Sequence, residues 1–325
     1  MPKRVTREDV ARLAGVSTAV VSYVINDGPR PVSSAARERV LAAIESTGYT
    51  PNRAAQTLAY GHAQSIGLLI PNNTNPFLAW MTQTFGDLAF TSEYTLILGD
   101  SADDTAREAA LVRHFLSQQL AGFIWYTVDQ PAPIELLGAS PPRTIILNAS
   151  EGLAPGPEVF LMTADEVAQG RIAAQHLIDR GCRRIGIIAG PSERLNTQMR
   201  MRGWEEALRA TGLDATRIVH ADFTEEAGEW ALPQLADCDG IVASNQRQGI
   251  GALAAAARIG IPIPDALKIV AINGTDAARY TNPSLSTVDQ NLEFLAARTV
   301  ELLQGESSVR TDVPLMLKAR KSTEQ

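Results

Sequence analysis

Cysteine is almost absent from this chain of 325 residues, which has only Cys182 and Cys238 and no Cys-x-x-Cys motif. A disulfide framework is therefore not expected, and the two thiols are better explained as buried or spare groups in a reducing compartment. Long apolar runs are also absent, since the longest, 249–257, falls well short of the ~18–20 residues that span a bilayer. Because the first ten residues lack the apolar core of a secretory signal, we expect a cytoplasmic protein with no membrane partner.

The common signatures of catalysis and cofactor binding are missing as well. The sequence has no Gly-x-x-x-x-Gly-Lys phosphate loop, no Gly-x-Ser-x-Gly nucleophile turn and no Gly-x-Gly-x-x-Gly fingerprint after a strand. Its four histidines are scattered along the chain. These absences predict a protein that is not an enzyme and that uses no cofactor or metal.

The net charge of −7 argues against a nucleic-acid partner, but the charge is unevenly distributed. The first sixty residues contain eight basic and five acidic side chains and so carry +3, whereas the other 265 residues carry −10. A basic head on an acidic body is typical of a DNA-reading module fused to a larger domain.

Residues 6–47 have the pattern of three short helices. A capping-box pattern begins the first helix at Thr6, Gly15 ends it, Ser17 caps the second and Ser33 begins the third. Two helices joined by so tight a turn make a helix-turn-helix. The apolar side chains expected to face inward are Val10, Leu13, Ala14, Val20, Val21, Val24, Ile25, Val40, Leu41 and Ile44.

From residue 65 onward, short apolar strands alternate with longer amphipathic helices, which predicts an α/β fold of parallel sheets covered on both faces. A weak repeat, 65–70 against 184–189, indicates two such lobes with a ligand cleft where the carboxyl ends of both sheets meet. The strand candidates are 66–70, 95–98, 123–126, 144–147, 185–189, 218–220, 241–243, 269–272 and 313–317.

We therefore expect two domains, a DNA-binding head at 1–60 and a core at 61–325. Within the core, one lobe is expected to comprise about 65–162 and 291–306, and the other about 163–290 and 307–321. Between head and core, segment 52–59 favours helix, but two turns are only marginally stable alone, so we expect a conditional hinge helix.

The chain resembles, over essentially its whole length, the lactose, galactose and purine repressor family. The resemblance implies a homodimer whose recognition helices enter adjacent major grooves of a palindromic operator. It also implies a periplasmic-binding-protein-like core with a small-molecule effector in its cleft. The matching residues include Val5, Thr6, Asp9, Val10, Ala11, Ala14, Gly15, Val16, Ser17, Val20, Val21, Ser22, Gly48, Tyr49, Pro51, Asn52, Asn75, Pro76, Phe77, Gly190, Pro191, Ser244, Asn245, Pro262, Pro264, Leu285, Ser286, Thr287 and Val288.

The resemblance implies a set of DNA contacts. Thr18, Ala19 and Tyr23 are expected at base edges, and Leu58 is expected to insert from the minor groove into the central base step. Tyr23 replaces the Arg or His that many relatives carry, so the recognition helix has no bidentate guanine reader. The whole implied set is Thr6 and Ser17 on phosphates, Thr18, Ala19, Ser22, Tyr23, Asn26, Arg53, Ala55 and Leu58.

The resemblance also implies an effector site. Amides occupy Asn148, Gln246 and Asn273, where sugar-binding relatives often have Asp, while Arg194 and Arg200 remain. We therefore expect a cationic pocket whose ligand brings a carboxylate or phosphate to the arginines, or is a derivatised sugar. The implied contacts are Phe77, Leu78, Trp125 or the adjacent Tyr126, Asn148, Arg194, Asn196, Arg200, Phe223, Asn245, Gln246 and Asn273.

Other readings stay open at this point. A neutral hexose is the alternative ligand, because Asp222 and Asp276 could neutralise the arginines instead. A solute-binding protein would share both lobes but carry no basic head. An enzyme would need a nucleophile, metal or phosphate loop, none of which the sequence offers.

Overall fold

The structure, a computed structural model, describes residues 5–25, 28, 30–50, 64–127, 132–148, 153–154, 156–307 and 310–324. The chain divides into two compact units, Met1–Ala63 and Gln64–Gln325, here called the head and the body. The boundary lies close to the one expected at residue 60. The expected hinge helix 52–59, with Arg53, Ala55 and Leu58, lies outside the described residues, and so does Asn26.

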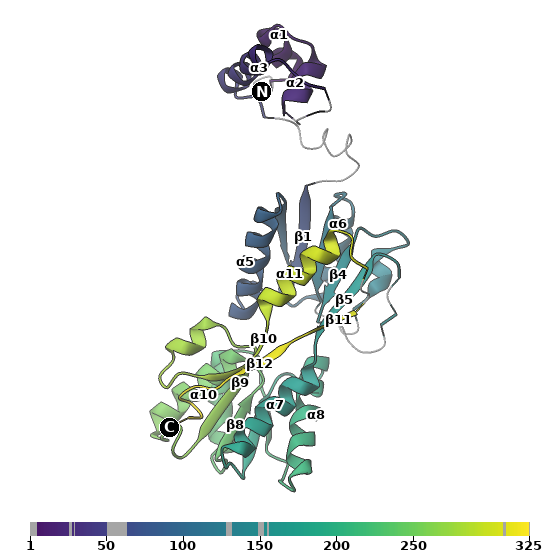
Figure 1. Ribbon diagram of the computed structural model, residues 1–325. Coiled ribbons are helices and arrows are strands. Elements are labelled where there is room, and N and C mark those ends of the chain that lie inside the picture. The colour runs from purple at the N-terminus through teal and green to yellow at the C-terminus, as the bar shows by residue number, and fades with distance from the viewer. Residues whose placement is uncertain are drawn as a thin grey trace. The chain divides into compact units, whose positions relative to one another are not determined.

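The described part of the head contains the three expected helices, drawn in purple in Figure 1. The capping box is formed, because the side chains and backbone of Thr6 and Asp9 bond reciprocally. Gly15 and Gly48 end the first and third helices with φ of 62° and 61°, a left-handed conformation that costs glycine little. The helices are α1 (Arg7–Ala14), α2 (Thr18–Ile25) and α3 (Ser34–Thr47).

The core of the head is narrower than its sequence pattern indicates. Leu13 and Leu41, both expected inside, are 60% and 51% exposed. The small residues Ala11 and Ala43 are buried in the interface between helices instead. The buried face of the two helices is formed by Val10, Ala11 and Ala14 of α1 and by Val40 and Ala43 of α3, and both leucines lie outside it.

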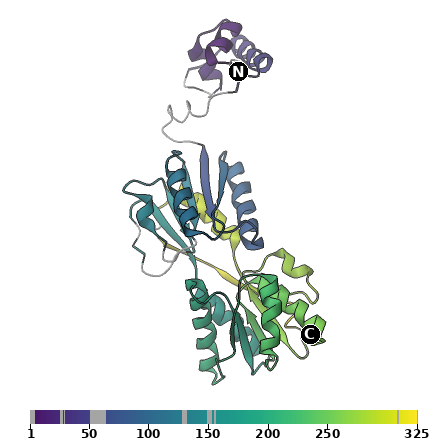
Figure 2. The same ribbon diagram turned by 180° about the vertical axis from the view of Figure 1, so that it is seen from behind.

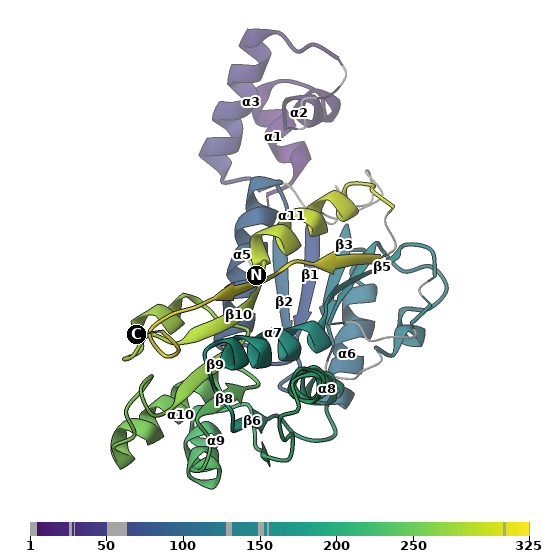
Figure 3. The same cartoon turned by 60° about the horizontal axis from the view of Figure 1, so that its bottom comes forward.

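The first lobe of the body has a six-stranded parallel sheet in the order β11-β5-β4-β3-β1-β2. One face of this sheet packs against α5 and α11 and the other against α6, as the view in Figure 3 shows. The elements are β1 (Ser65–Ile70), α5 (Pro76–Thr91), β2 (Thr95–Asp100), α6 (Thr105–Leu116), β3 (Gly122–Tyr126), η1 (Ile134–Leu137), β4 (Thr144–Leu147), β5 (Val159–Ala164), α11 (Leu292–Leu303) and β11 (Arg310–Val313).

The second lobe repeats this plan with a sheet in the order β12-β10-β9-β8-β6-β7, in which only β12 is antiparallel. Helices α7 and α8 cover one face, and α9 and α10 cover the other. The elements are α7 (Glu166–Asp179), β6 (Ile185–Ala189), α8 (Leu195–Ala210), β7 (Ile218–His220), α9 (Glu225–Ala231), η2 (Leu232–Leu235), β8 (Gly240–Ala243), α10 (Gln246–Ile259), β9 (Lys268–Ile272), η3 (Asp276–Tyr280), β10 (Ser286–Gln290) and β12 (Leu315–Lys318).

The chain passes between the lobes three times, after β5, after β10 and at Pro314, and Figure 2 shows these segments from behind. The expected single strand 313–317 is in fact two strands, and β11 pairs with β5 in the first sheet. The assignment of 310–313 to the second lobe was therefore wrong. Strand β10 was missed because its sequence, Ser-Thr-Val-Asp-Gln, is mostly polar although every residue is buried.

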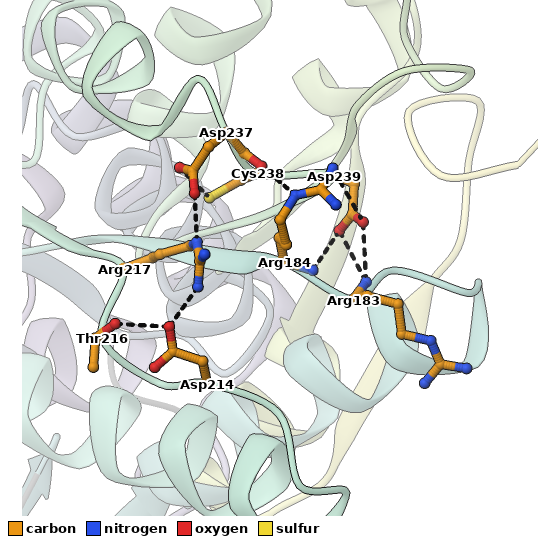
Figure 4. Close-up of polar contacts among 8 residues, drawn as sticks. All are labelled: Arg183, Arg184, Asp214, Thr216, Arg217, Asp237, Cys238 and Asp239. Carbon is orange, nitrogen blue, oxygen red and sulfur yellow. Dashed lines mark hydrogen bonds and ion pairs between the residues drawn. The ribbon is translucent and has the colours of Figure 1, made fainter.

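Hydrogen bonds and ion pairs link the turns at the end of the second sheet where β6, β7 and β8 begin, away from the cleft (Figure 4). The Asp239 carboxylate accepts hydrogen bonds from the backbone N–H groups of Arg183 and Arg184 at 2.8–3.1 Å. Cys182 and Cys238 lie beside these turns, and burial raises the pKa of their thiols to about 11 and about 12. Both cysteines are free and buried, which confirms the expectation from the sequence.

Candidate functional site

The head presents one face of α2 to solvent. Thr18 and Ala19 are exposed, whereas Val21 and Val24 on the opposite side are buried in the head core. Ser22 and Tyr23 are half-buried. The helix contains no basic residue, so any base contact it makes must come from hydroxyl and methyl groups.

Ser17 and Thr6, the two residues expected to contact phosphates, differ in the hydrogen bonds that their hydroxyl groups make within the head. Ser17 caps α2, because its Oγ accepts from the backbone N–H of Val20 at 3.3 Å, and its own proton stays available. Thr6 instead donates both its hydroxyl proton and its backbone N–H to the Asp9 carboxylate, at 2.8 and 3.0 Å. A phosphate would have to displace the Asp9 carboxylate to bind Thr6, so the structure disfavours the expected contact between Thr6 and a phosphate.

Two neighbouring cavities lie between the lobes of the body, where loops after the strands of both sheets converge. The larger has a volume of about 380 Å³ and the smaller about 60 Å³. They share four lining residues, Asn75, Asn196, Phe223 and Arg247. The larger volume lies within the ~300–1,000 Å³ usual for small-molecule sites.

Most residues expected at the effector site line these cavities. Leu78, Asn148 and Arg194 line the larger, and Asn196 and Phe223 line both. The residues lining the smaller one are Phe77, Arg200, Asn245, Gln246 and Asn273. Of the two acids proposed to neutralise the arginines, Asp222 lines the larger cavity, whereas Asp276 lines neither.

Trp125 is the exception, and its assignment to the cleft was wrong. Its side chain is fully buried on the α6 side of the sheet, where the indole Nε1 donates to Glu108 Oε1 at 2.8 Å. Adjacent residues of a strand point to opposite faces, so Tyr126 lines the larger cavity instead. Burial, and then the nearby Glu166 carboxylate, raise the pKa of Tyr126 above its ordinary value, so its hydroxyl stays protonated.

Arg200 already has its partner within the protein. Its side chain is 2% exposed, and Nε lies 2.6 Å from Oε2 of Glu166, which is itself 7% exposed. Nη1 donates to the carbonyl oxygen of Ser244 at 2.8 Å. The expectation that a ligand supplies the counter-charge to Arg200 was therefore wrong, because Glu166 at the start of α7 supplies it.

The other two arginines of the cleft also face carboxylates. Arg194 Nη2 lies 3.7 Å from Oδ1 of Asp103, so this ion pair joins the two lobes at the larger cavity. Arg247 binds Glu225 at 2.6 Å through Nε. Burial alone would raise the pKa of Glu225, but the hydrogen bond and the charge of Arg247, together with a backbone hydrogen bond, lower that pKa overall. The pocket is thus balanced in charge, not cationic as expected.

The amides of the smaller cavity are engaged with one another and with the backbone. Gln246 and Thr275 bond reciprocally, through Gln246 Nε2 to Thr275 Oγ1 and Thr275 N–H to Gln246 Oε1. Asn273 Oδ1 accepts from Gln290 Nε2 at 2.9 Å. Asn245 caps α10 by accepting from the N–H of Gln248 at 2.8 Å. These bonds hold the amides in fixed orientations toward the cavity.

Asn148 and Asn273 occupy equivalent places in the two lobes, each directly after a central strand. Both have a left-handed backbone, with φ of 57° and 58°, which asparagine adopts more readily than most residues. Strained residues of this kind concentrate at ligand sites. Their position therefore supports a binding role for both.

Sequence reasoning missed the three carboxylates that pair with the arginines, Asp103, Glu166 and Glu225, and it missed Arg247. Glu166 follows β5, a strand that the sequence analysis did not include, so its place at a strand end was not visible. Arg247 directly follows Asn245 and Gln246 in the sequence, and that proximity could have identified it.

The described residues contain neither a membrane-spanning helix nor a metal-binding cluster. No described helix is both long and apolar enough to cross a membrane. No cluster of three His, Cys, Asp or Glu side chains suited to a metal ion occurs in that part of the chain.

Known proteins share both parts of this architecture. Residues 6–52 match the family model of bacterial regulatory proteins, lacI family, and residues 174–323 match a periplasmic binding protein-like domain. The HTH-type transcriptional regulator CelR of Thermobifida fusca is 30% identical over 328 residues, covering 97% of this chain and 95% of CelR.

Solved structures agree with the sequence comparison. The transcriptional regulator CelR–cellobiose complex superposes with a TM-score of 0.70 at 28% identity, covering 98% of this chain and 100% of that one. The lac repressor dimer bound to operator and the anti-inducer ONPF has a TM-score of 0.88 at 23% identity over 99% of both chains, which shows a shared fold. By its similarity to CelR over nearly the whole length, the chain belongs to the lacI family of bacterial regulatory proteins, and it is a DNA-binding transcriptional regulator, not an enzyme.

Proposed function

We propose that this regulator is a cytoplasmic repressor that binds a palindromic operator as a homodimer, and that a neutral, polyhydroxylated small molecule in the cleft changes its affinity for DNA. In the head, Thr18, Ala19 and Tyr23 would read base edges, and Leu58 would insert at the operator centre. Because a helix of only two turns, as expected for the hinge, would be marginally stable alone, an effector could act on DNA by favouring a body conformation that separates the two hinges of the dimer.

The charge balance of the cleft is the main observation in favour of a neutral ligand over an anionic one. Asp103, Glu166 and Glu225 each neutralise one of the three arginines at the cavities. An anionic ligand would have to compete with these carboxylates, and burying its charge without a free partner is costly. A neutral ligand meets no such cost.

The remaining lining suits a sugar. Asp222 is exposed at the larger cavity, and its carboxylate makes no hydrogen bond or ion pair within the described part of the chain. A carboxylate can accept hydrogen bonds from two neighbouring hydroxyl groups. Tyr126 and Phe223 offer aromatic rings for the apolar face of a sugar. The relative CelR has been solved with cellobiose, which supports a ligand of this class.

A thermal-shift panel of neutral sugars, sugar phosphates and sugar acids tests the ligand class. A ligand at 100 times its Kd stabilises the protein by about 2.7 kcal/mol, which corresponds to a rise in Tm of about 5–10 °C for a unit of this size. We expect neutral sugars to produce this shift. Stabilisation by anionic compounds alone would contradict the proposal.

The role of Asp222 is tested by comparing Asp222→Asn with Glu226→Gln. Glu226 is exposed on the neighbouring helix and lines neither cavity, so its loss removes one charge nearby without touching the ligand. A hydrogen bond to a charged group contributes about 1.5–3 kcal/mol, so Asp222→Asn should weaken binding about tenfold or more, and Glu226→Gln should not. Equal effects of the two variants would remove Asp222 from the site.

The operator proposal is tested by selection from random duplex DNA with the full chain. A homodimer with two recognition helices should select a sequence whose halves are inverted repeats centred about 10 base pairs apart or a multiple of that spacing. Selection of no consensus, or of an asymmetric one, would contradict it.

A further inference from the structure

Gly28 lies against Tyr23, the longest side chain on the exposed part of the recognition helix. The Gly28 N–H donates to the Tyr23 carbonyl oxygen at 3.1 Å, which holds Gly28 against the end of α2. A Cβ atom added at residue 28 would lie 2.5 Å from Cδ1 of the Tyr23 ring and 3.2 Å from its Cα. The half-buried ring therefore packs directly on the backbone of Gly28.

Backbone conformation does not explain why residue 28 is glycine. Gly15 and Gly48, the other two glycines among the described residues of the head, have left-handed φ values, and a Cβ at either would meet nothing within 4 Å. Gly28 shows the reverse pattern, because its φ lies outside the left-handed region and the space for a Cβ is filled by the ring. An alanine there would avoid left-handed strain, but its methyl group would have to displace the Tyr23 ring and would lie close against the Tyr23 Cα.

The ring position matters because α2 offers so few polar groups. Its sequence, Thr-Ala-Val-Val-Ser-Tyr-Val-Ile, contains no Arg, Lys, Asn or Gln. Tyr23 therefore has the longest polar side chain of the helix, and that side chain is rigid. A tyrosine ring packed against the backbone points its hydroxyl in one direction, whereas a free ring would sample several.

We infer that Gly28 is a positioning residue for base recognition: it holds the Tyr23 ring so that the hydroxyl meets one base pair of each operator half-site. This inference rests on the proposed role of Tyr23 as a base reader. It assigns a part of operator specificity to a residue outside the recognition helix, one that need not touch DNA.

A double-mutant cycle read out by sequence selection tests the inference. Full-length wild type, Gly28→Ala, Tyr23→Ala and the double variant each select from random duplex DNA, and affinities for the four base pairs at the Tyr23-dependent position are then measured. We expect Tyr23→Ala to weaken discrimination at one position of each half-site about three- to tenfold, the lower range for a base contact. Gly28→Ala should weaken discrimination at the same position, and should change nothing further when Tyr23 is already alanine.

Gly48→Ala is the matched control, because it places a methyl group in open space but on a left-handed backbone. It should lower the Tm of the head, followed by circular dichroism of the full chain, and leave base preference unchanged. Gly28→Ala should alter base preference at the Tyr23-dependent position, beyond any lowering of the Tm that its contact with the Tyr23 ring causes.

Three results separate the possible failures. If wild type selects no consensus, operator binding itself is refuted, and the inference with it. If Tyr23→Ala leaves the preference intact, Tyr23 is no base reader and has nothing for Gly28 to position. The third result is that Tyr23→Ala changes the preference but Gly28→Ala does not, or that Gly28→Ala has the same effect with and without the tyrosine. Either outcome overturns only the positioning role of Gly28 and leaves Tyr23 as a base reader.

Discussion

The buried ion pair between Arg200 and Glu166 allows a quantitative prediction about the stability of the body. The two side chains are 2% and 7% exposed, and their closest atoms are 2.6 Å apart. Glu166→Gln keeps the size and polarity of residue 166 but leaves the guanidinium without its counter-charge. Removing one partner of a buried pair typically costs about 3–5 kcal/mol, because the remaining charge is stranded away from water.

A second ion pair of the same kind in the same lobe supplies the control. Glu205 lies 2.9 Å from Arg209 on the surface of α8, and the arginine side chain is 71% exposed. Exposed pairs one helical turn apart contribute only about 0.3–0.5 kcal/mol. Glu205→Gln makes the same chemical change, so the difference between the two variants isolates the effect of burial.

Urea unfolding of the full chain, followed by circular dichroism, measures both variants. We expect Glu166→Gln to lose about 3–5 kcal/mol of unfolding free energy in the transition of the body, and Glu205→Gln to lose less than about 0.5 kcal/mol. The Glu166→Leu, Arg200→Met double variant should recover much of the loss, because neither buried charge remains. Equal costs for the two single Glu→Gln variants would refute the reasoning.

Three further predictions concern pH, packing and thiol reactivity. Burial, and then Arg180, lower the pKa of His176 in the folded chain. The neutral imidazole therefore contributes its full stabilisation above pH ~6.5, and this stabilisation is lost as the pH falls toward the pKa of the folded state. On acidification, the urea midpoint should drop less in His176→Gln than in wild type. A Cβ at Gly203 would lie 1.8 Å from a carbonyl oxygen of the facing helix α7. Gly203→Ala should therefore lower the unfolding free energy by about 1–3 kcal/mol or more. Gly156→Ala is the control and should not lower it, because a Cβ there would meet only open space. Because the thiol pKa values of Cys182 and Cys238 are raised, iodoacetamide should alkylate them far more slowly in the native chain than in urea; equal rates would contradict their burial.

Local signals in the sequence were sufficient to predict much of the molecule. The three head helices follow from their caps and from glycine at Gly15, because each cap acts within four residues of the chain. The two α/β lobes follow from the alternation of apolar strands and amphipathic helices. Ten of the eleven effector residues that the family resemblance implied line the cavities, and each follows a strand, as ligand-binding residues of parallel sheets do.

Tertiary structure alone decided the features that depend on side-chain direction and on distant partners. Strand β3 is buried on both faces, so its apolar run could not show that Tyr126 and not Trp125 faces the cleft. The ion pairs of the cleft join residues far apart in the sequence: 34 positions separate Glu166 from Arg200, and Arg194 meets Asp103 of the other lobe. A sequence records which charges a protein contains, but only the folded chain sets the distances that decide which of them neutralise each other.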